Sequence, residues 1–223
     1  MNDKNIVLKN QLAALILDCI EKDQKLPSEQ EMMDSFSVSR FSLREALSVF
    51  EANGIITSQR GSGRFAKYPD LGTQIKNIWG MFIDSKPTLF LDFMEIRSYL
   101  ELSAIPKVAL TIRPEELLLL RKCINEMKQC SIVSREFSQA DRNFHELLYR
   151  SQGNTLLKQL ISVYWDVCDD SIIWPSIDPR ETIQMHEDIL SALASSDADR
   201  TVSALQAHFE DTKTQMTLAL LNK

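Results

Sequence analysis

The chain has 223 residues, of which 44% are hydrophobic and 25% charged, a composition that excludes wholesale disorder. Its length favours a small domain followed by a medium one, which we place at residues 1–69 and 73–223. No apolar run approaches the roughly 20 residues of a membrane span, so we expect a cytoplasmic protein without a membrane partner. The net charge of −6 argues against nucleic-acid binding by the protein surface as a whole.

Three short helices are predicted in the first 54 residues. Apolar residues recur on one helical face between residues 5 and 21. Ser28 and Glu31 have the spacing of a capping box, so a second helix begins after Ser28. Residues 37 and 38 make a tight turn, and Ser39 can cap a third helix that stops at Gly54.

Two short strands follow, at residues 55–58 and 64–66, around a glycine-containing turn. A helix pair followed by such a hairpin predicts a winged helix-turn-helix with a small β-hairpin wing. Residues 68–72 break the pattern and mark the domain boundary.

The remainder of the sequence has helical periodicity throughout, which predicts an all-α antiparallel bundle and a mainly α fold class. Pro106 falls inside one predicted helix, which it should kink or divide. The helices are expected at about residues 73–84, 88–110, 114–130, 134–151, 153–171, 180–195 and 198–221.

Positive charge is concentrated around the helix pair and the wing. Residues 38–67 hold five arginines or lysines against two glutamates, a local net charge of +3 on an acidic chain. The N-terminal residues of the second helix of such a pair lie nearest the base edges, and arginine can grip guanine or neutralise phosphate. The alternative is an ordinary solvated surface. The candidate DNA-binding residues are Ser39, Arg40, Ser42, Arg44, Arg60, Gly61, Gly63 and Arg64.

All three histidines lie in the helical part. Asp141 and His145 are spaced i, i+4 and share a helical face, whereas His186 and His208 flank a break midway between them. A helical hairpin at that break sets the two histidines at the same height. Three imidazoles and a carboxylate suit Zn²⁺, Ni²⁺, Mn²⁺ or Fe²⁺, and the alternative is three unrelated surface histidines.

The stretches LPSEQEM at residues 26–32, VSRFSLREAL at 38–47 and RGSG at 60–63 resemble the signature of GntR-family winged helices, over residues 6–67. The resemblance implies that Arg40 and Arg44 contact DNA and that the turn around Gly61 and Gly63 is the wing. Many family members have arginine where this chain has Gln30, so a contact made there should be absent or altered.

The segments around the histidines resemble the metal-binding version of the FadR-type C-terminal domain, the FCD domain of the FadR subfamily, over about residues 75–220. The resemblance implies one divalent metal, zinc first, with a carboxylate or sugar-acid effector against it. Arg97 matches an arginine that faces this pocket, although it could instead pair with Glu101. The implied metal ligands are Asp141, His145, His186 and His208.

Two groups of residues are expected to serve packing alone. The four cysteines lack paired short spacings, which argues against disulfides or a thiolate zinc site, and we expect buried or half-buried thiols at Cys19, Cys123, Cys130 and Cys168. Aromatic and methionine residues at helical spacing more often fill a core than line a pocket, and we assign to the core Tyr164, Trp165, Trp174, Met127 and Met185.

The leading hypothesis is therefore a homodimeric repressor that binds a pseudo-palindromic double-stranded operator and is released or modulated by the acid effector. One alternative is a metal-dependent hydrolase with an accessory winged helix, since the same ligands could activate water. A second is a protein-binding helical module whose winged helix no longer binds DNA.

Overall fold

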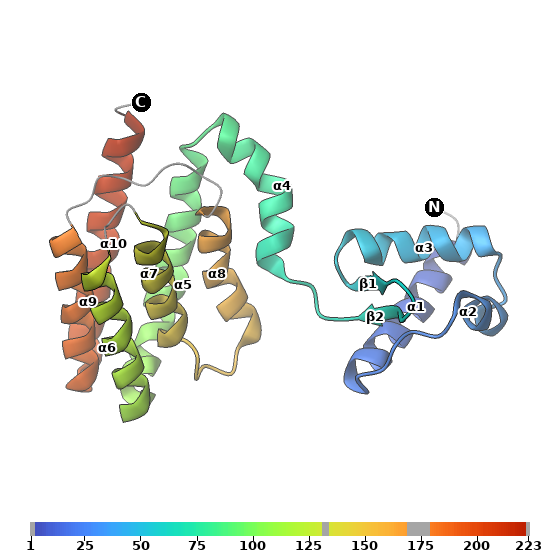
Figure 1. The fold of residues 1–223 in the computed structure, drawn as a ribbon, viewed down its shortest axis with the longest axis horizontal. Helices are drawn as coiled ribbons and strands as arrows, with labels where there is room; N and C mark the ends of the chain where they lie inside the picture. The colour runs from blue at the N-terminus through green and yellow to red at the C-terminus, as the bar shows by residue number, and fades with distance from the viewer. Residues whose placement is uncertain (1–2, 131–133, 169–178, 222–223) are drawn as a thin grey trace. The chain divides into compact units, whose positions relative to one another are not determined.

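The computed structural model describes residues 3–130, 134–168 and 179–221, and the chain divides into two compact units, Met1–Asp70 and Leu71–Lys223 (Figure 1). The mainly α fold, with a hairpin after the N-terminal helices and a helical bundle later in the chain, is confirmed.

The first unit contains three helices and a two-stranded sheet. Ser28 begins the second helix through a complete capping box with Glu31, and Ser39 begins the third by accepting a hydrogen bond from the Ser42 backbone N–H. Ser37 makes the turn between them with a left-handed φ of 54°. The elements are α1 (Asp3–Glu21), α2 (Glu29–Phe36), α3 (Arg40–Ala52), β1 (Ile56–Gln59) and β2 (Gly63–Ala66).

The strands pair antiparallel with Gln59 opposite Gly63, and an isolated bridge from Lys25 to Phe65 ties the chain before α2 to the wing. The core of this unit consists of one face of α1 together with Leu26 and buried residues from α2, α3 and β1. It is formed by Leu8, Leu12, Ile16, Cys19, Leu26, Met32, Leu43, Ala46, Leu47 and Ile56.

The second unit is helical in every part that the structure describes. Helices α5, α6, α7, α9 and α10 run side by side in Figure 1, with α10 packed on α5 and α9, and α6 packed on α7 and α9. The helices are α4 (Leu71–Ser85), α5 (Leu89–Thr111), α6 (Pro114–Gln129), α7 (Arg135–Leu148), α8 (Thr155–Cys168), α9 (Pro179–Ala194) and α10 (Ala198–Leu221).

Pro106 does not divide its helix, because α5 continues without interruption from Leu89 to Thr111. Proline removes a single backbone donor, and the neighbouring Ile105, Val108 and Ala109 are buried in the core of the unit. This packing on both sides of the proline accounts for the continuity of the helix.

The described cysteines are free thiols, with Cys19 and Cys123 buried and Cys130 half-buried as expected. Burial raises the pKa of the Cys123 thiol to about 11, so it is unreactive. The side chains of Cys168 and Trp174 lie outside the described residues. Met127, Tyr164 and Trp165 are buried, and Met185 is half-buried.

No helix within the described ranges combines the length and apolar character needed to cross a membrane.

Candidate metal centre and nucleic-acid interface

The first turn of α3 presents several of the predicted DNA-binding residues to solvent. Ser39 and Arg40 are exposed, while Ser42 is half-buried and its hydroxyl lies 3.0 Å from that of Ser39. Arg40 forms no ion pair with any described residue, and the same holds for Arg60 in the wing turn. Both guanidinium groups are therefore available to a phosphate or a base.

The other two arginines are held by carboxylates. Glu29, at the start of α2, accepts from Arg44 Nε at 3.0 Å and from Arg64 Nη2 at 3.0 Å, and Arg64 Nε also donates to Glu51 at 3.0 Å. Burial alone would raise the pKa of Glu29, but these guanidinium groups hold it below its usual value. Glu29 thus joins α2, α3 and the wing, a role that the sequence analysis missed.

The wing turn depends on glycine. Gly61 and Gly63 have φ of +81° and +111°, where a side chain is strained, and nothing described lies within 4 Å of a Cβ at Gly61. Arg60 and Gly61 are exposed beside this turn, whereas Arg64 is half-buried against Glu29 and Glu51.

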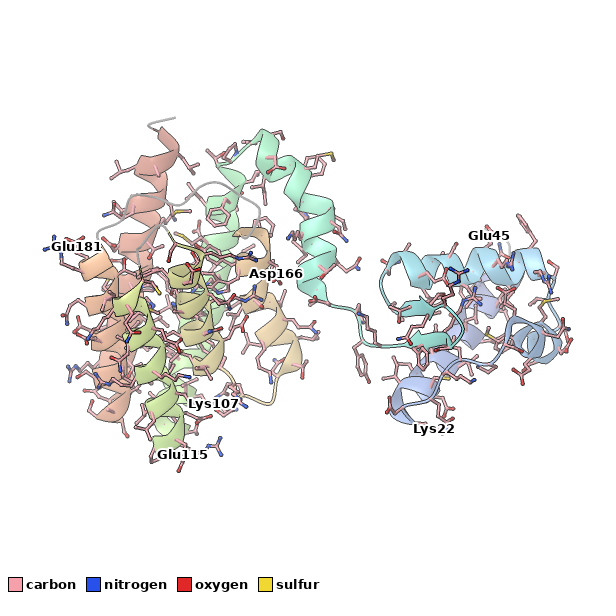
Figure 2. All side chains as sticks on the ribbon, in the orientation of Figure 1. Lys22, Glu45, Lys107, Glu115, Asp166 and Glu181 are labelled. Atoms are coloured by element: carbon pink, nitrogen blue, oxygen red, sulfur yellow. The ribbon has the colours of Figure 1, made fainter. Side chains whose placement is uncertain are left out.

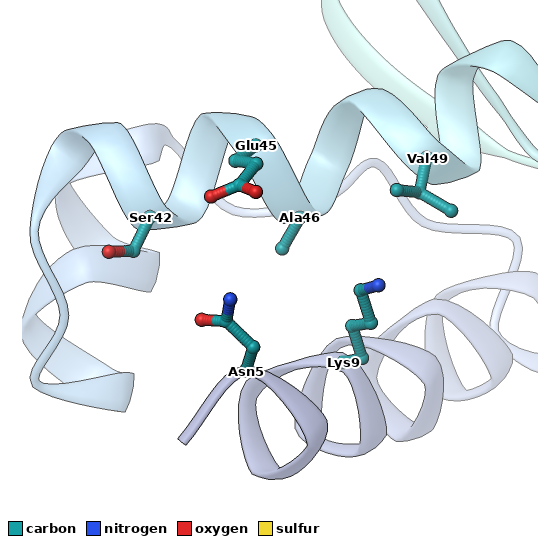
Figure 3. Close-up of a pocket in the computed structure, with 6 residues that line it drawn as sticks. All are labelled: Asn5, Lys9, Ser42, Glu45, Ala46 and Val49. Atoms are coloured by element: carbon teal, nitrogen blue, oxygen red, sulfur yellow. The ribbon is translucent and has the colours of Figure 1, made fainter. Parts of the chain in front are cut away.

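A small hollow of about 50 Å³ lies between α1 and α3, where Asn5 and Lys9 face Ser42, Glu45, Ala46 and Val49 (Figure 3). Ligand pockets usually enclose at least about 300 Å³, so this hollow does not suit an effector.

Three helices bring the histidines together in the second unit. Each imidazole offers one ligand atom, and the three atoms all lie within 4.8 Å of one another. His186 and His208 lie at similar heights on the α9–α10 hairpin, with ring centroids 4.7 Å apart, and His145 of α7 lies 5.1 Å from His208. Asp141 Oδ1 is 3.0 Å from His186 Nε2 and 3.5 Å from His145 Nε2.

Hydrogen bonds on the outer side of two rings determine which nitrogen faces inward. His145 Nδ1 lies 2.8 Å from a Glu101 carboxylate oxygen, and His186 Nδ1 lies 2.7 Å from the Thr182 carbonyl. Both partners are acceptors, so each Nδ1 carries a proton and the Nε2 atom of each ring faces Asp141.

Two imidazole Nε2 atoms and a carboxylate oxygen therefore converge on one point, and neutral rings would direct their lone pairs there, where a cation could accept them. Atoms bound to one ion at about 2.0–2.1 Å are separated by about 3.0–3.4 Å, close to the Asp141–histidine distances. His145 Nε2 and His208 Nδ1 are buried with no hydrogen-bond partner among the described residues. The donor set fits a divalent metal.

The electrostatics of the cluster also suit a cation. Burial, opposed by Glu101, lowers the pKa of His145, and burial with the two neighbouring imidazoles holds the pKa of His208 well below its ordinary value. Burial alone would raise the pKa of Asp141, but the His186 hydrogen bond and the surrounding imidazoles keep that pKa low. His145 and His208 are therefore neutral beside an ionised carboxylate, and these are the states that bind metals.

Arg97 lies next to this cluster and is 3% exposed. Its Nε donates to Glu101 at 2.6 Å, so the pairing expected as the alternative is present. Its guanidinium carbon lies 4.5 Å from the ring centroids of Tyr164 and Trp165, while Nη2 has no hydrogen-bond partner among the described residues. Pairing with Glu101 therefore leaves one buried donor available for an anion.

Glu101 is the second residue that the sequence analysis missed as a partner of the site. It is fully buried, and its two oxygens contact Arg97 and His145 separately. Its i, i+4 spacing from Arg97 was visible in the sequence. Its contact with His145, 44 positions away, leaves no local pattern in the sequence.

Arg142, the neighbour of Asp141 on α7, connects the cluster to α8. Its Nη1 lies 2.9 Å from Asp166 Oδ1, and its Nη2 donates to Ser162 at 2.9 Å (Asp166 is labelled in Figure 2). Asp166 in turn closely approaches the backbone of Gly72 in the first turn of α4.

Comparisons with known proteins match both units. The FCD domain model matches residues 92–211, and the model described as bacterial regulatory proteins, gntR family, matches residues 8–65. The HTH-type transcriptional repressor NanR of Cronobacter sakazakii is 30% identical over 195 residues, covering 83% of this chain and 74% of that protein. The Uxu operon regulator of Haemophilus influenzae is 26% identical over 200 residues, covering 86% and 73% respectively.

Solved structures show the same fold. The Streptococcus agalactiae GntR structure superposes with a TM-score of 0.71 at 22% identity, covering 94% of this chain and 99% of that chain.

Proposed function

Because the chain belongs to the GntR family of bacterial regulatory proteins, we propose that α3 binds a DNA operator and that the second unit senses an organic acid at a divalent metal. The general function is that of a DNA-binding regulator of transcription. The matched domains and relatives are regulators rather than enzymes, which does not support the metal-dependent hydrolase considered above.

The DNA contact rests on the first turn of α3 and on the wing. Arg40 and Arg60 have no ion pair among the described residues, whereas Glu29 fixes the positions of Arg44 and Arg64 relative to each other. An operator could therefore bind two unpaired guanidinium groups and two that Glu29 already holds in place. The candidate contacts remain Ser39, Arg40, Ser42, Arg44, Arg60, Gly61, Gly63 and Arg64.

Replacing Arg40 with alanine tests this interface. R40A is expected to weaken operator binding at least tenfold and, if Arg40 binds phosphate, to reduce the slope of log affinity against log salt by about one. Arg121→Ala, an exposed arginine of α6, is the matched control. Equal affinities for wild type, R40A and R121A over a range of salt concentrations would contradict the proposal.

The metal proposal rests on the convergence of His145 Nε2 and His186 Nε2 on Asp141, with His208 completing the set. Zinc is the first choice, and nickel, manganese and iron are compatible with the same donors. When bound, the metal supplies a positive charge at which an anion can dock.

The effector is proposed to be a small carboxylate or sugar acid that also uses Arg97, because the guanidinium keeps a buried donor after pairing with Glu101. The relative NanR is a repressor, which supports repression as the mode of action. A homodimer on a pseudo-palindromic operator completes the proposal, since two-fold protein symmetry matches paired half-sites.

Thermal unfolding of metal-stripped protein tests the metal proposal. Zinc at about 100 times its dissociation constant should add about 2.7 kcal/mol of stability, a shift of several degrees. His208→Ala should abolish that shift, whereas R40A should keep it. A midpoint that ignores zinc, nickel, manganese and iron alike would contradict a metal centre.

A further inference from the structure

Phe41 is a large apolar side chain that the fold leaves in solvent. It is 77% exposed, the highest value among the exposed large hydrophobic residues of the described chain. The buried face of α3 is formed by Leu43, Ala46 and Leu47. At 100° per residue, Phe41 lies about 200° around the helix from Leu43, so the core cannot cover it.

The backbone that carries this ring is nevertheless held in a defined conformation. Phe41 is the second residue of α3, and Ser39 caps that turn by accepting from the Ser42 backbone N–H at 3.2 Å. Arg40, immediately before it, has no ion pair among the described residues. A capped turn therefore presents an aromatic ring beside an available cation.

The chemistry of the major groove limits what an apolar side chain can recognise there. Base edges in the major groove present hydrogen-bond donors and acceptors, and the apolar feature among them is the C5 methyl group of thymine. A hydrogen-bonding edge loses water without compensation when a phenyl ring covers it, whereas a methyl group gains from the same contact.

We propose that Phe41 packs against a thymine methyl in each operator half-site and makes the protein prefer thymine at that position. The inference rests on the proposed placement of α3 in the major groove. It adds a specificity-determining contact to the arginines, which hold phosphate or guanine.

Deoxyuridine provides a direct test, because it differs from thymidine only by the missing methyl group. Full-length protein is first used to select bound duplexes from a random-sequence library. Each thymine of a half-site is then replaced with deoxyuridine, and affinity is measured by fluorescence anisotropy at fixed salt. Wild type should lose about fourfold per half-site at one thymine, the effect of one buried methyl group.

Phe41→Ala should bind the thymine and deoxyuridine duplexes equally, so the double-mutant cycle assigns the methyl effect to Phe41. Val49→Ala, a partly exposed apolar residue near the other end of α3, is the control and should retain the full methyl effect. The thermal midpoint of F41A should match that of wild type, because the ring is outside the core.

The outcomes separate this inference from the proposed function. Specific binding that is indifferent to every thymine methyl, or a methyl effect that persists in F41A, overturns the role of Phe41 alone. Failure of wild type to bind any duplex at low salt overturns the proposed function and the inference together.

Discussion

At the scale of the residue, the second unit contains a chain of polar contacts that is unusual for a helical core. Glu101 is fully buried yet ionised, since burial would raise its pKa and its contacts with His145 and Arg97 more than offset that effect. The carboxylate fixes the proton of His145 on Nδ1 and holds Arg97 through Nε. Outer hydrogen bonds of this kind orient metal-binding histidines and strengthen their binding.

Replacing Glu101 with glutamine should lower metal affinity about 10- to 100-fold, because the amide offers one acceptor where the carboxylate serves two donors. Competition against a chromophoric chelator measures the affinity. Glu116→Gln, a buried glutamate in the capping box of α6, is the matched control and should bind metal as wild type does. Equal affinity in E101Q would remove Glu101 from the site.

The low pKa values of His145 and His208 predict a pH dependence for the metal-free protein. In the unfolded chain these histidines take up protons near the ordinary histidine pKa of 6.5, whereas in the folded chain they do not. The free energy of unfolding is therefore highest above that pH and falls as the pH drops below it. The loss is at most about 1.4 kcal/mol per pH unit and histidine.

Thermal unfolding between about pH 7.5 and 5.5 measures this loss. His208→Gln removes one titrating group and should flatten the dependence. A midpoint that stays constant over this range in the wild type would contradict buried neutral imidazoles.

Glu29 and Glu101 mark the limit of sequence reasoning at this scale. Local spacing predicts the Arg97–Glu101 pair and the Asp141–His145 face, because a helix sets i, i+4 neighbours. The contacts from Glu29 to Arg64 and from Glu101 to His145 span 35 and 44 positions, and they depend on how elements pack. No local pattern encodes such distances.

At the scale of the element, capping residues predict where the helices begin, whereas turn residues predict less well where the helices end. The start of α3 follows from Ser39, whereas α7 ends at Leu148, three residues before the predicted limit of 151. The chain turns there through bonds from Arg150 to Leu147 and from Gln152 to Tyr149, and Asn154 then caps α8. Apolar periodicity continues across such turns and obscures them.

The first turn of α4 depends on a glycine for close packing against α8. A Cβ at Gly72 would lie 1.9 Å from Asp166 Oδ2, and Arg142 holds that carboxylate in place. Gly72→Ala should therefore lower stability by about 1–3 kcal/mol, or several degrees in the midpoint of the second unit.

Gly80, in the interior of the same helix, has nothing described within 4 Å of a Cβ. Gly80→Ala should accordingly raise stability by about 0.5–1 kcal/mol, the ordinary gain from replacing a helix glycine. Midpoints measured for both variants decide the matter. Similar shifts in G72A and G80A would show that Asp166 moves aside without cost.

At the scale of the whole molecule, charge is distributed unevenly along the chain. The chain carries a net charge of −6, yet residues 38–67, which contain α3 and the wing, carry +3. Sequence predicts this asymmetry and the two kinds of fold, because charge and periodicity are local properties. The ligand that the second unit is proposed to bind depends instead on how α5, α7, α8, α9 and α10 pack around the histidine cluster.

In the proposed function, an acid bound at the metal changes DNA binding. The most direct test is operator affinity at fixed salt for metal-stripped protein, zinc-loaded protein and zinc-loaded protein with each of a panel of small carboxylic and sugar acids. The account predicts that one acid weakens binding at least fivefold with zinc present and has no effect without it, or in His208→Ala. Operator affinity that is the same under every one of these conditions would contradict it.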